Sequence, residues 1–297
     1  MWQAERVKSL LEVTLPNQPV EIVIIHTRGD KILDKPYVQV GGKGIFTKEI
    51  EDALLAGEID FAVHSFKDLP AVQPEGLDIV CIPERDSPYD ALFSTSVSRL
   101  SDLPEAPTLA TGSPRRRAQL LALRPQATIL DLRGNVNTRL KKFHESEWDG
   151  MIMAHAAIRR MGWEERIAGP IAIEEMLPAA AQGALAIEAR TDDQATREAL
   201  DAIHNKQTAI SVTAERAFLA NLEGSCHIPI AAYGQVNDAT LHLEGMLASL
   251  DGDPLIRQRI DGPIEEAQRL GTELAESIKQ AGGQAIIERL TQPESQQ

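Results

Sequence analysis

Cysteine is scarce in this sequence: among 297 residues it occurs only at Cys81 and Cys226. Two cysteines provide no disulfide framework of the kind that holds small secreted domains together. Apolar runs are short as well, and no stretch of 18 or more apolar residues is available to span a membrane. The first residues, MWQAERVKSLLEV, lack the apolar core of a signal peptide. We therefore expect a cytoplasmic protein that does not enter a membrane.

Internal repeats and low-complexity segments are also missing. Hydrophobic residues make up 43% of the chain and charged residues 25%, which is ordinary for a globular protein. This composition argues against disorder, collagen-like repeats and coiled coil. The length fits two or three domains.

The charge balance is negative, at 30 − 44 = −14, which argues against general nucleic-acid binding. One segment opposes this trend, because residues 115–142 have a local balance of 8 − 1 = +7. Two interpretations stay open: a solvated helix face, or a site for a small polyanion. The basic residues are Arg115, Arg116, Arg117, Arg124, Arg133, Arg139, Lys141 and Lys142, and the one acid is Asp131.

Strand and helix patterns alternate over the first half of the chain. Short apolar runs rich in β-branched residues predict strands, and apolar residues at helical spacing predict a helix over 45–58 that stops near Gly57. Such alternation favours a mostly parallel α/β sheet with helices on both faces. The predicted strands cover 21–27, 59–65, 77–84, 90–95, 108–113, 127–134 and 150–156.

The pattern changes beyond residue 190. Residues 194–222 favour helices, and residues 228–260 contain three strand-like runs with a hairpin turn at Asn237-Asp238. A long amphipathic helix over about 263–281 and a last short helix follow. We expect an α+β domain with an antiparallel sheet and a frayed C-terminal tail.

Two strand-to-helix turns carry arginines. Ser113 and Asn135 are candidate N-caps, and Arg115, Arg116 and Arg133 lie beside them. Free backbone N–H groups and the helix dipole attract anions at such turns, and guanidinium groups bind carboxylates in bidentate fashion. Two such turns in adjacent units, meeting in one cleft, favour the polyanion site.

The strand in AVHSFKDLP (62–70) ends on charged residues. If it stays extended, its period of two puts His64, Phe66 and Asp68 on one side. Lys67 then falls on the other side. A carboxylate beside a lysine is able to stabilise a developing cation or move a proton, while the alternative is a helix cap or an ion pair.

Two further segments are glycine-rich. VGGKGIF (40–46) lacks the spacing of a phosphate-binding loop, so either a mobile loop carrying Lys43 or a plain turn remains. Cys226, in LEGSCHIPI, follows Gly and Ser, which suggests a loop with an accessible thiol. Its neighbour His227 does not make a zinc pattern, and we expect no metal site. Cys81, within an apolar run, is typical of a buried cysteine.

Taken together, the chain resembles the porphobilinogen deaminase family, also called hydroxymethylbilane synthases. The resemblance implies three domains: 1–83 plus 184–203, then 84–183, both like the α/β lobes of periplasmic binding proteins, and 204–297, an α+β domain with the cysteine. It rests on VGGKGIFTKEIE, DFAVHSFKDLP, ATGSPRRRAQL, LRGNVNTRL, LPAAAQGALAIE and LEGSCHIPI, in the family's order.

The resemblance also implies an activity. The family condenses four porphobilinogen molecules head to tail into hydroxymethylbilane and releases ammonia, in tetrapyrrole biosynthesis. The growing chain is anchored on one dipyrromethane cofactor, held by a thioether that falls on Cys226 here. Its pyrroles carry acetate and propionate groups, so the ligand is a polyanion. We expect a monomeric enzyme with porphobilinogen as its small-molecule partner and no nucleic-acid partner.

The resemblance assigns roles to residues. Asp68 becomes the central acid/base residue, and Lys43 and Phe46 lie in a loop that covers the cleft. Gln182 marks the return to the first domain. The residues implied to bind cofactor and substrate are Lys67, Ser113, Arg115, Arg116, Arg133, Arg139, Arg160 and Gln182.

The sequence departs from the family's pattern in three places. Ala157 and Ala181 stand where glycine is usual, which removes backbone freedom. Trp2-Gln3-Ala4 matches the family's first helix part-way along, so we expect a preceding strand to be encoded upstream. Two alternatives to an active transferase follow: a truncated, inactive relative, or a non-catalytic two-lobed protein that binds small polyanions.

Overall fold

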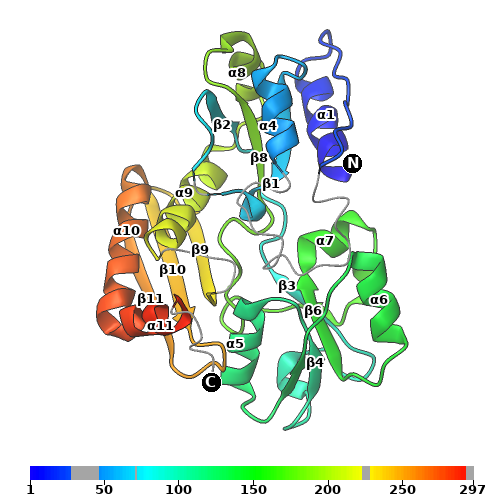
Figure 1. Cartoon of the computed structure of the whole chain (residues 1–297), viewed down its shortest axis with the longest axis vertical. Helices are drawn as coiled ribbons and strands as arrows, with labels where there is room; N and C mark the ends of the chain where they lie inside the picture. The colour runs from blue at the N-terminus through cyan, green and yellow to red at the C-terminus, as the bar shows by residue number, and fades with distance from the viewer. Residues whose placement is uncertain (28–46, 71, 223–227, 292–297) are drawn as a thin grey trace. The chain divides into compact units, whose positions relative to one another are not determined.

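The computed structural model describes residues 1–27, 47–70, 72–222 and 228–291. Internal contacts divide the chain into two units, drawn in Figure 1. Unit 1 comprises Met1–Arg85 and Ala184–Ala209, and unit 2 comprises Asp86–Gly183 and Ile210–Gln297. Residues 86–183 and 210–297 share one unit, so the finer division into three domains stays a prediction.

Unit 1 contains a three-stranded sheet in the order β1-β8-β2, with both pairs antiparallel. Val7 and Leu11 of α1 pack with Cys81, Leu185 and Ile187 of the sheet to form its core. The elements of unit 1 are α1 (Trp2–Thr14), α4 (Lys48–Leu55), β1 (Phe61–Ser65), the 3₁₀ turn η1 (Phe66–Asp68), β2 (Leu77–Cys81), β8 (Leu185–Arg190), α8 (Gln194–Asp201) and the start of α9 (Lys206–Asn221).

The strand predicted at 21–27 is wrong. These residues adopt no strand, and Val23 and Ile24 are 56% and 62% exposed. Apolar β-branched residues favour extended backbone, but a strand also needs a neighbouring backbone to pair with. Within the described residues, none of β1, β2 or β8 pairs with this segment.

The α/β part of unit 2 is built on a five-stranded sheet in the order β5-β4-β6-β3-β7. Two helices, α5 and α6, follow the strands that the sequence predicts for them. The elements are β3 (Asp90–Phe93), η2 (Leu100–Asp102), β4 (Thr108–Ala110), α5 (Pro114–Leu123), β5 (Thr128–Leu130), α6 (Val136–His144), β6 (Gly150–Ala154), α7 (His155–Arg160), η3 (Glu164–Arg166) and β7 (Gly169–Pro170).

The prediction of a mostly parallel sheet is also wrong. β4 is parallel to β5 and β6, but β3 is antiparallel to β6 and β7, and the sheet of unit 1 is antiparallel. Consecutive strand–helix–strand units produce parallel pairs. β3 and β8 instead follow the points where the chain passes from one unit to the other, so no crossover helix fixes their direction.

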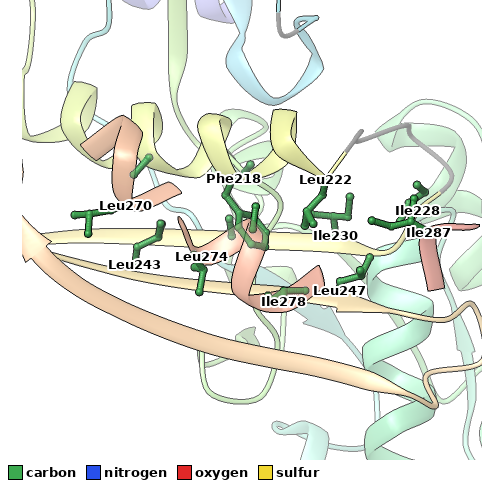
Figure 2. Packing of buried hydrophobic residues seen from close by; sticks show 14 of the residues in the cluster. Phe218, Leu222, Ile228, Ile230, Leu243, Leu247, Leu270, Leu274, Ile278 and Ile287 are labelled. Carbon is green, nitrogen blue, oxygen red and sulfur yellow. The ribbon is translucent and has the colours of Figure 1, made fainter. Parts of the chain in front are cut away.

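The C-terminal part of unit 2 is an antiparallel sheet in the order β11-β10-β9. The predicted hairpin forms between β9 and β10, but its loop is at residues 238–239, with Asp238 at φ of 53° and Asn237 still paired with Thr240. Figure 2 shows side chains of α9, α10 and this sheet meeting in one core, among them Phe218, Leu243 and Leu274. The elements are β9 (Ile230–Asn237), β10 (Thr240–Ala248), β11 (Leu255–Pro263), η4 (Ile264–Glu266), α10 (Ala267–Ile278), η5 (Lys279–Gly283) and α11 (Gln284–Thr291).

Ala181 is strained. It is fully buried and has φ of 59°, in the left-handed region that favours glycine. Its N–H donates to Glu215 Oε2 at 2.6 Å, which holds the backbone in this conformation. A non-glycine residue here costs about 1 kcal/mol or more. Ala157 is different, because it lies inside helix α7, where alanine is more favourable than glycine.

Candidate functional site

The carboxyl ends of β4, β5 and β6 lie at one edge of the five-stranded sheet, because these strands are parallel. Helices α5, α6 and α7 begin at this edge. The two arginine-bearing turns are neighbours there: Thr111 N donates to Leu130 O at 2.9 Å. A Cβ added to Gly112 would lie 2.5 Å from Leu132 O, so only glycine permits this approach.

Local sequence explains both turns. Ser113 caps α5 by accepting from Arg116 N at 3.5 Å, with Pro114 at the first helical position. Asn135 caps α6 by accepting from Thr138 N at 2.9 Å. Both predicted N-caps are confirmed.

The first turn carries two buried arginines, Arg115 and Arg116, which both bind Asp90. Asp90 is the first residue of β3 and pairs with Ala154 at the end of β6, so the antiparallel direction of β3 brings it to this edge. Arg115 Nη1 donates to Asp90 Oδ2 at 2.8 Å, and Arg115 Nη2 donates to Oδ1 at 3.2 Å. Arg116 donates to Oδ1 from Nε at 3.0 Å and from Nη2 at 2.8 Å. Both guanidinium groups therefore donate two or more hydrogen bonds to the same carboxylate.

Gln182 completes this cluster from the end of the first stretch of unit 2, Asp86–Gly183. Its Nε2 donates to Asp90 Oδ1 at 2.9 Å and to the carbonyl oxygen of Pro88 at 2.8 Å. Arg116 Nη2 also reaches Gln182 Oε1 at 3.5 Å, and Arg115 Nη1 donates to Leu177 O at 2.7 Å. The structure thus brings together three residues that the sequence predicts for the site: Arg115, Arg116 and Gln182.

The cluster keeps an excess of positive charge. Burial alone would raise the pKa of Asp90, but the charges of Arg115 and Arg116 and their hydrogen bonds outweigh it and hold that pKa well below its usual range. Asp90 is therefore ionised. Burial lowers the pKa of the Arg115 guanidinium, against the raising effect of Asp90. Two guanidinium groups and one carboxylate sum to +2 − 1 = +1.

The second turn is exposed. Arg133 is 57% exposed, and its Nε donates to the equally exposed Asp131 Oδ2 at 2.6 Å. Arg139 Nε donates to Gly134 O at 2.7 Å, and Lys142 Nζ donates to Arg133 O at 3.2 Å. Arg133 and Lys142 are exposed and Arg139 is half-buried, so the start of α6 carries cations at the surface.

Helix α7 carries Arg160, which is half-buried. At its start, His155 Nδ1 lies 2.8 Å from Ser87 Oγ, and Arg159 Nη1 donates to Asp86 Oδ1 at 2.5 Å. Burial lowers the pKa of His155 from its usual value. These contacts fix α7 to the first residues of unit 2.

Asp68 and Lys67 belong to unit 1. They lie in the turn η1, which begins where β1 ends and is anchored by Phe66 N donating to Ala184 O at 3.1 Å. The chain does not stay extended beyond Ser65, so the condition for placing His64, Phe66 and Asp68 on one side is not met. Asp68 is exposed and Lys67 is half-buried.

His64 is a residue of β1, just before this turn. Its Nε2 lies 3.1 Å from Glu188 Oε2, and both side chains are buried. Glu188 Oε1 has no hydrogen-bond donor within the part of the chain that the structure describes.

Three predicted residues, Lys43, Phe46 and Cys226, lie outside the described residues, and their roles stay predictions. The predicted burial of Cys81 is confirmed: it is fully buried, and burial, assisted by the charge of Asp201, raises the pKa of its thiol to about 12.

The site includes one residue that the sequence did not predict as functional, Asp90. An acid at the start of the apolar run DALF (90–93) was the available signal. Within the described residues, no helix is long and apolar enough to cross a membrane.

The fold and this edge define an α/β protein that gathers cations at the carboxyl ends of its parallel strands. Two family models match the chain: "Porphobilinogen deaminase, dipyromethane cofactor binding domain" over residues 1–198 and "Porphobilinogen deaminase, C-terminal domain" over residues 209–280. The chain belongs to the porphobilinogen deaminase family.

Two relatives illustrate the similarity. The porphobilinogen deaminase of Geobacter sulfurreducens is 47% identical over 294 residues, covering 99% of this chain and 92% of the relative. That of Trichlorobacter lovleyi is also 47% identical, covering 99% and 94%. Among solved structures, an ABC-transporter periplasmic substrate-binding protein from Coxiella burnetii covers 72% of this chain and 92% of its own, at 12% identity and a TM-score of 0.42, which is too low to support a conclusion.

Proposed function

We propose that the chain condenses four porphobilinogen molecules head to tail into hydroxymethylbilane and releases ammonia, as a transferase of tetrapyrrole biosynthesis. The observation that carries this proposal is the 47% identity to a porphobilinogen deaminase over 99% of the chain. The cationic edge of unit 2 supports it, because porphobilinogen and its oligomers carry acetate and propionate groups.

The residues present fit a dipyrromethane cofactor. The excess charge of the Asp90 cluster, the start of α6 and the exposed guanidinium of Arg133 offer charge complementary to its carboxylates. The thioether would form at Cys226. The other residues that would hold the cofactor are Lys67, Ser113, Arg115, Arg116, Arg133, Arg139, Arg160 and Gln182. When bound, this group supplies the anchor from which the pyrrole chain grows.

Asp68 acts on the incoming substrate. The aminomethyl group of porphobilinogen is protonated, so its C–N bond breaks with ammonia taking the electron pair, and the remaining azafulvenium carries the positive charge. The Asp68 carboxylate stabilises that charge and accepts a proton at the pyrrole nitrogen. Meanwhile the arginines bind the carboxylates of the substrate and so keep its ring in place.

Asp68→Asn tests this role. The variant keeps the size of the side chain but removes its charge, and we expect the rate of hydroxymethylbilane formation to fall about 10²–10³-fold. Asp60→Asn is the matched control, because Asp60 is a 78% exposed acid of the same unit. Rates of Asp68→Asn within threefold of wild type would refute the assignment.

Intact mass tests the cofactor. Wild-type protein, expressed in cells that make porphobilinogen, should carry the mass of one dipyrromethane, and Cys226→Ser should not. Cys81→Ala should keep the added mass. An unmodified wild-type mass would contradict the proposal.

We further propose that the enzyme is monomeric and cytoplasmic. Light scattering of the purified protein and fractionation of the producing cells check these two statements. A dimer in dilute solution or recovery outside the cytoplasm would contradict them.

A further inference from the structure

The arginine pair of the first turn is enclosed together with its carboxylate. Asp90 is 0% exposed, and Arg115 and Arg116 are 5% and 6% exposed. Asp90 accepts hydrogen bonds from both arginines, so a carboxylate is already bound where the sequence predicts that these arginines bind ligand carboxylates.

The charges inside the cluster do not cancel. Burying an ion without a counterion is costly, and one carboxylate neutralises only one of the two guanidinium groups. Arg115 Nε is buried and has no acceptor within the described residues. Arg116 Nη1 has only a long contact of 3.4 Å to Ile152 O. The pair therefore retains both one positive charge and N–H groups that are poorly satisfied.

We propose that Asp90 is a positioning residue that occupies one of two carboxylate places on the Arg115–Arg116 pair. The Asp90 carboxylate holds both guanidinium groups in place and neutralises one of their two charges. The remaining positive charge is left for a carboxylate of the bound cofactor or substrate. This inference rests on the proposed function, since that function supplies the acidic ligand.

The alternative is that Asp90 only stabilises the fold as a buried ion pair. The two roles predict different ligand binding for variants that lose the same amount of stability. A purely structural Asp90 affects ligand binding no more than any other core residue that destabilises the sheet equally. A positioning Asp90 affects ligand binding beyond its effect on stability.

The first test is rescue by formate. In Asp90→Ala the missing carboxylate leaves a space between two cations, and breaking a buried ion pair should lower the Tm by about 6–20 °C. We expect formate to restore at least half of this loss, and chloride at the same ionic strength to restore little. Leu92→Ala, a buried cavity variant of the same strand, should respond equally to both salts.

The second test measures cofactor loading by intact mass. Asp90→Asn keeps the side-chain volume, so it remains available if Asp90→Ala does not fold. We expect the loaded fraction of Asp90→Asn to fall at least fivefold, and that of Leu92→Ala to stay within twofold of wild type.

The outcomes separate the two proposals. A Tm of Asp90→Ala that rises no more with formate than with chloride overturns the place assigned to Asp90. Normal loading of Asp90→Asn overturns its positioning role. A wild-type protein without cofactor counts against the proposed function, and the formate result then still decides on Asp90.

Discussion

The two arginine-bearing turns have the same local design and opposite surroundings. Each follows a strand of one parallel pair, each begins a helix with a confirmed N-cap, and each carries arginine within three residues of that cap. Yet Arg115 is 5% exposed and bound to Asp90, whereas Arg133 is 57% exposed and paired with Asp131 at the surface.

The difference lies in what the tertiary structure places opposite each turn. The antiparallel strand β3 brings Asp90 to the first turn, and Gln182 closes it. At the second turn, the side chains of Arg139 and Lys142 bond to the carbonyl oxygens of Gly134 and Arg133 in the same segment. The same local motif therefore holds a buried pair of arginines fixed by Asp90 at the first turn and an exposed arginine at the second.

The largest expected effect tests the buried turn. Arg115→Leu should lower the free energy of unfolding by about 3–5 kcal/mol, because Asp90 loses a bidentate partner inside the protein. Chemical denaturation measures this. Arg117→Leu, an exposed neighbour on the same helix, should cost less than about 1 kcal/mol. Equal losses of unfolding free energy for Arg115→Leu and Arg117→Leu would show that the buried and exposed faces of α5 contribute alike to stability.

The next effect tests the exposed turn. Arg133→Leu should change the free energy of unfolding by less than about 1 kcal/mol, since its ion pair is solvated. Substrate binding should weaken by about 2–5 kcal/mol if the contact is well desolvated in the complex. The KM for porphobilinogen and denaturation together check this. Near-normal binding would make Arg133 an ordinary surface residue.

The two N-caps offer a smaller, matched pair. Ser113→Ala and Asn135→Ala should each cost about 1 kcal/mol of unfolding free energy, because each removes the acceptor of a helix N–H. We expect the two losses to agree within about 1 kcal/mol despite the different burial of the turns. A loss at Ser113 several times larger would mean that the cap also orients the arginine pair.

The smallest effect concerns the segment that supports the buried turn. Ala181→Gly relieves a positive φ next to Gln182, and we expect stabilisation by about 0.5–1 kcal/mol. The Tm checks this, with Ala157→Gly as the opposite control, because that change should destabilise helix α7. A loss of stability in Ala181→Gly would show that the backbone is not strained there.

Local signals in the sequence predicted most of this edge. N-cap residues and apolar periodicity located α5 and α6, and the basic residues pointed to an anion site. Asp90 was not predicted, because it reaches Arg115 only through the pairing of β3 with β6 across 25 residues of chain. The strand at 21–27 failed for a related reason, since pairing depends on neighbours that composition does not specify.

The burial of Cys81 has a practical consequence. With its thiol fully enclosed and its pKa raised to about 12, Cys81 should not react with thiol reagents while the protein is folded. The chain has one other cysteine, Cys226. A colorimetric thiol count on native protein therefore reports on Cys226 alone, and denaturation adds Cys81 as an internal standard for protein concentration. With the thioether proposed at Cys226, the native reading divided by the increase on denaturation gives the fraction of molecules whose Cys226 sulfur is not alkylated.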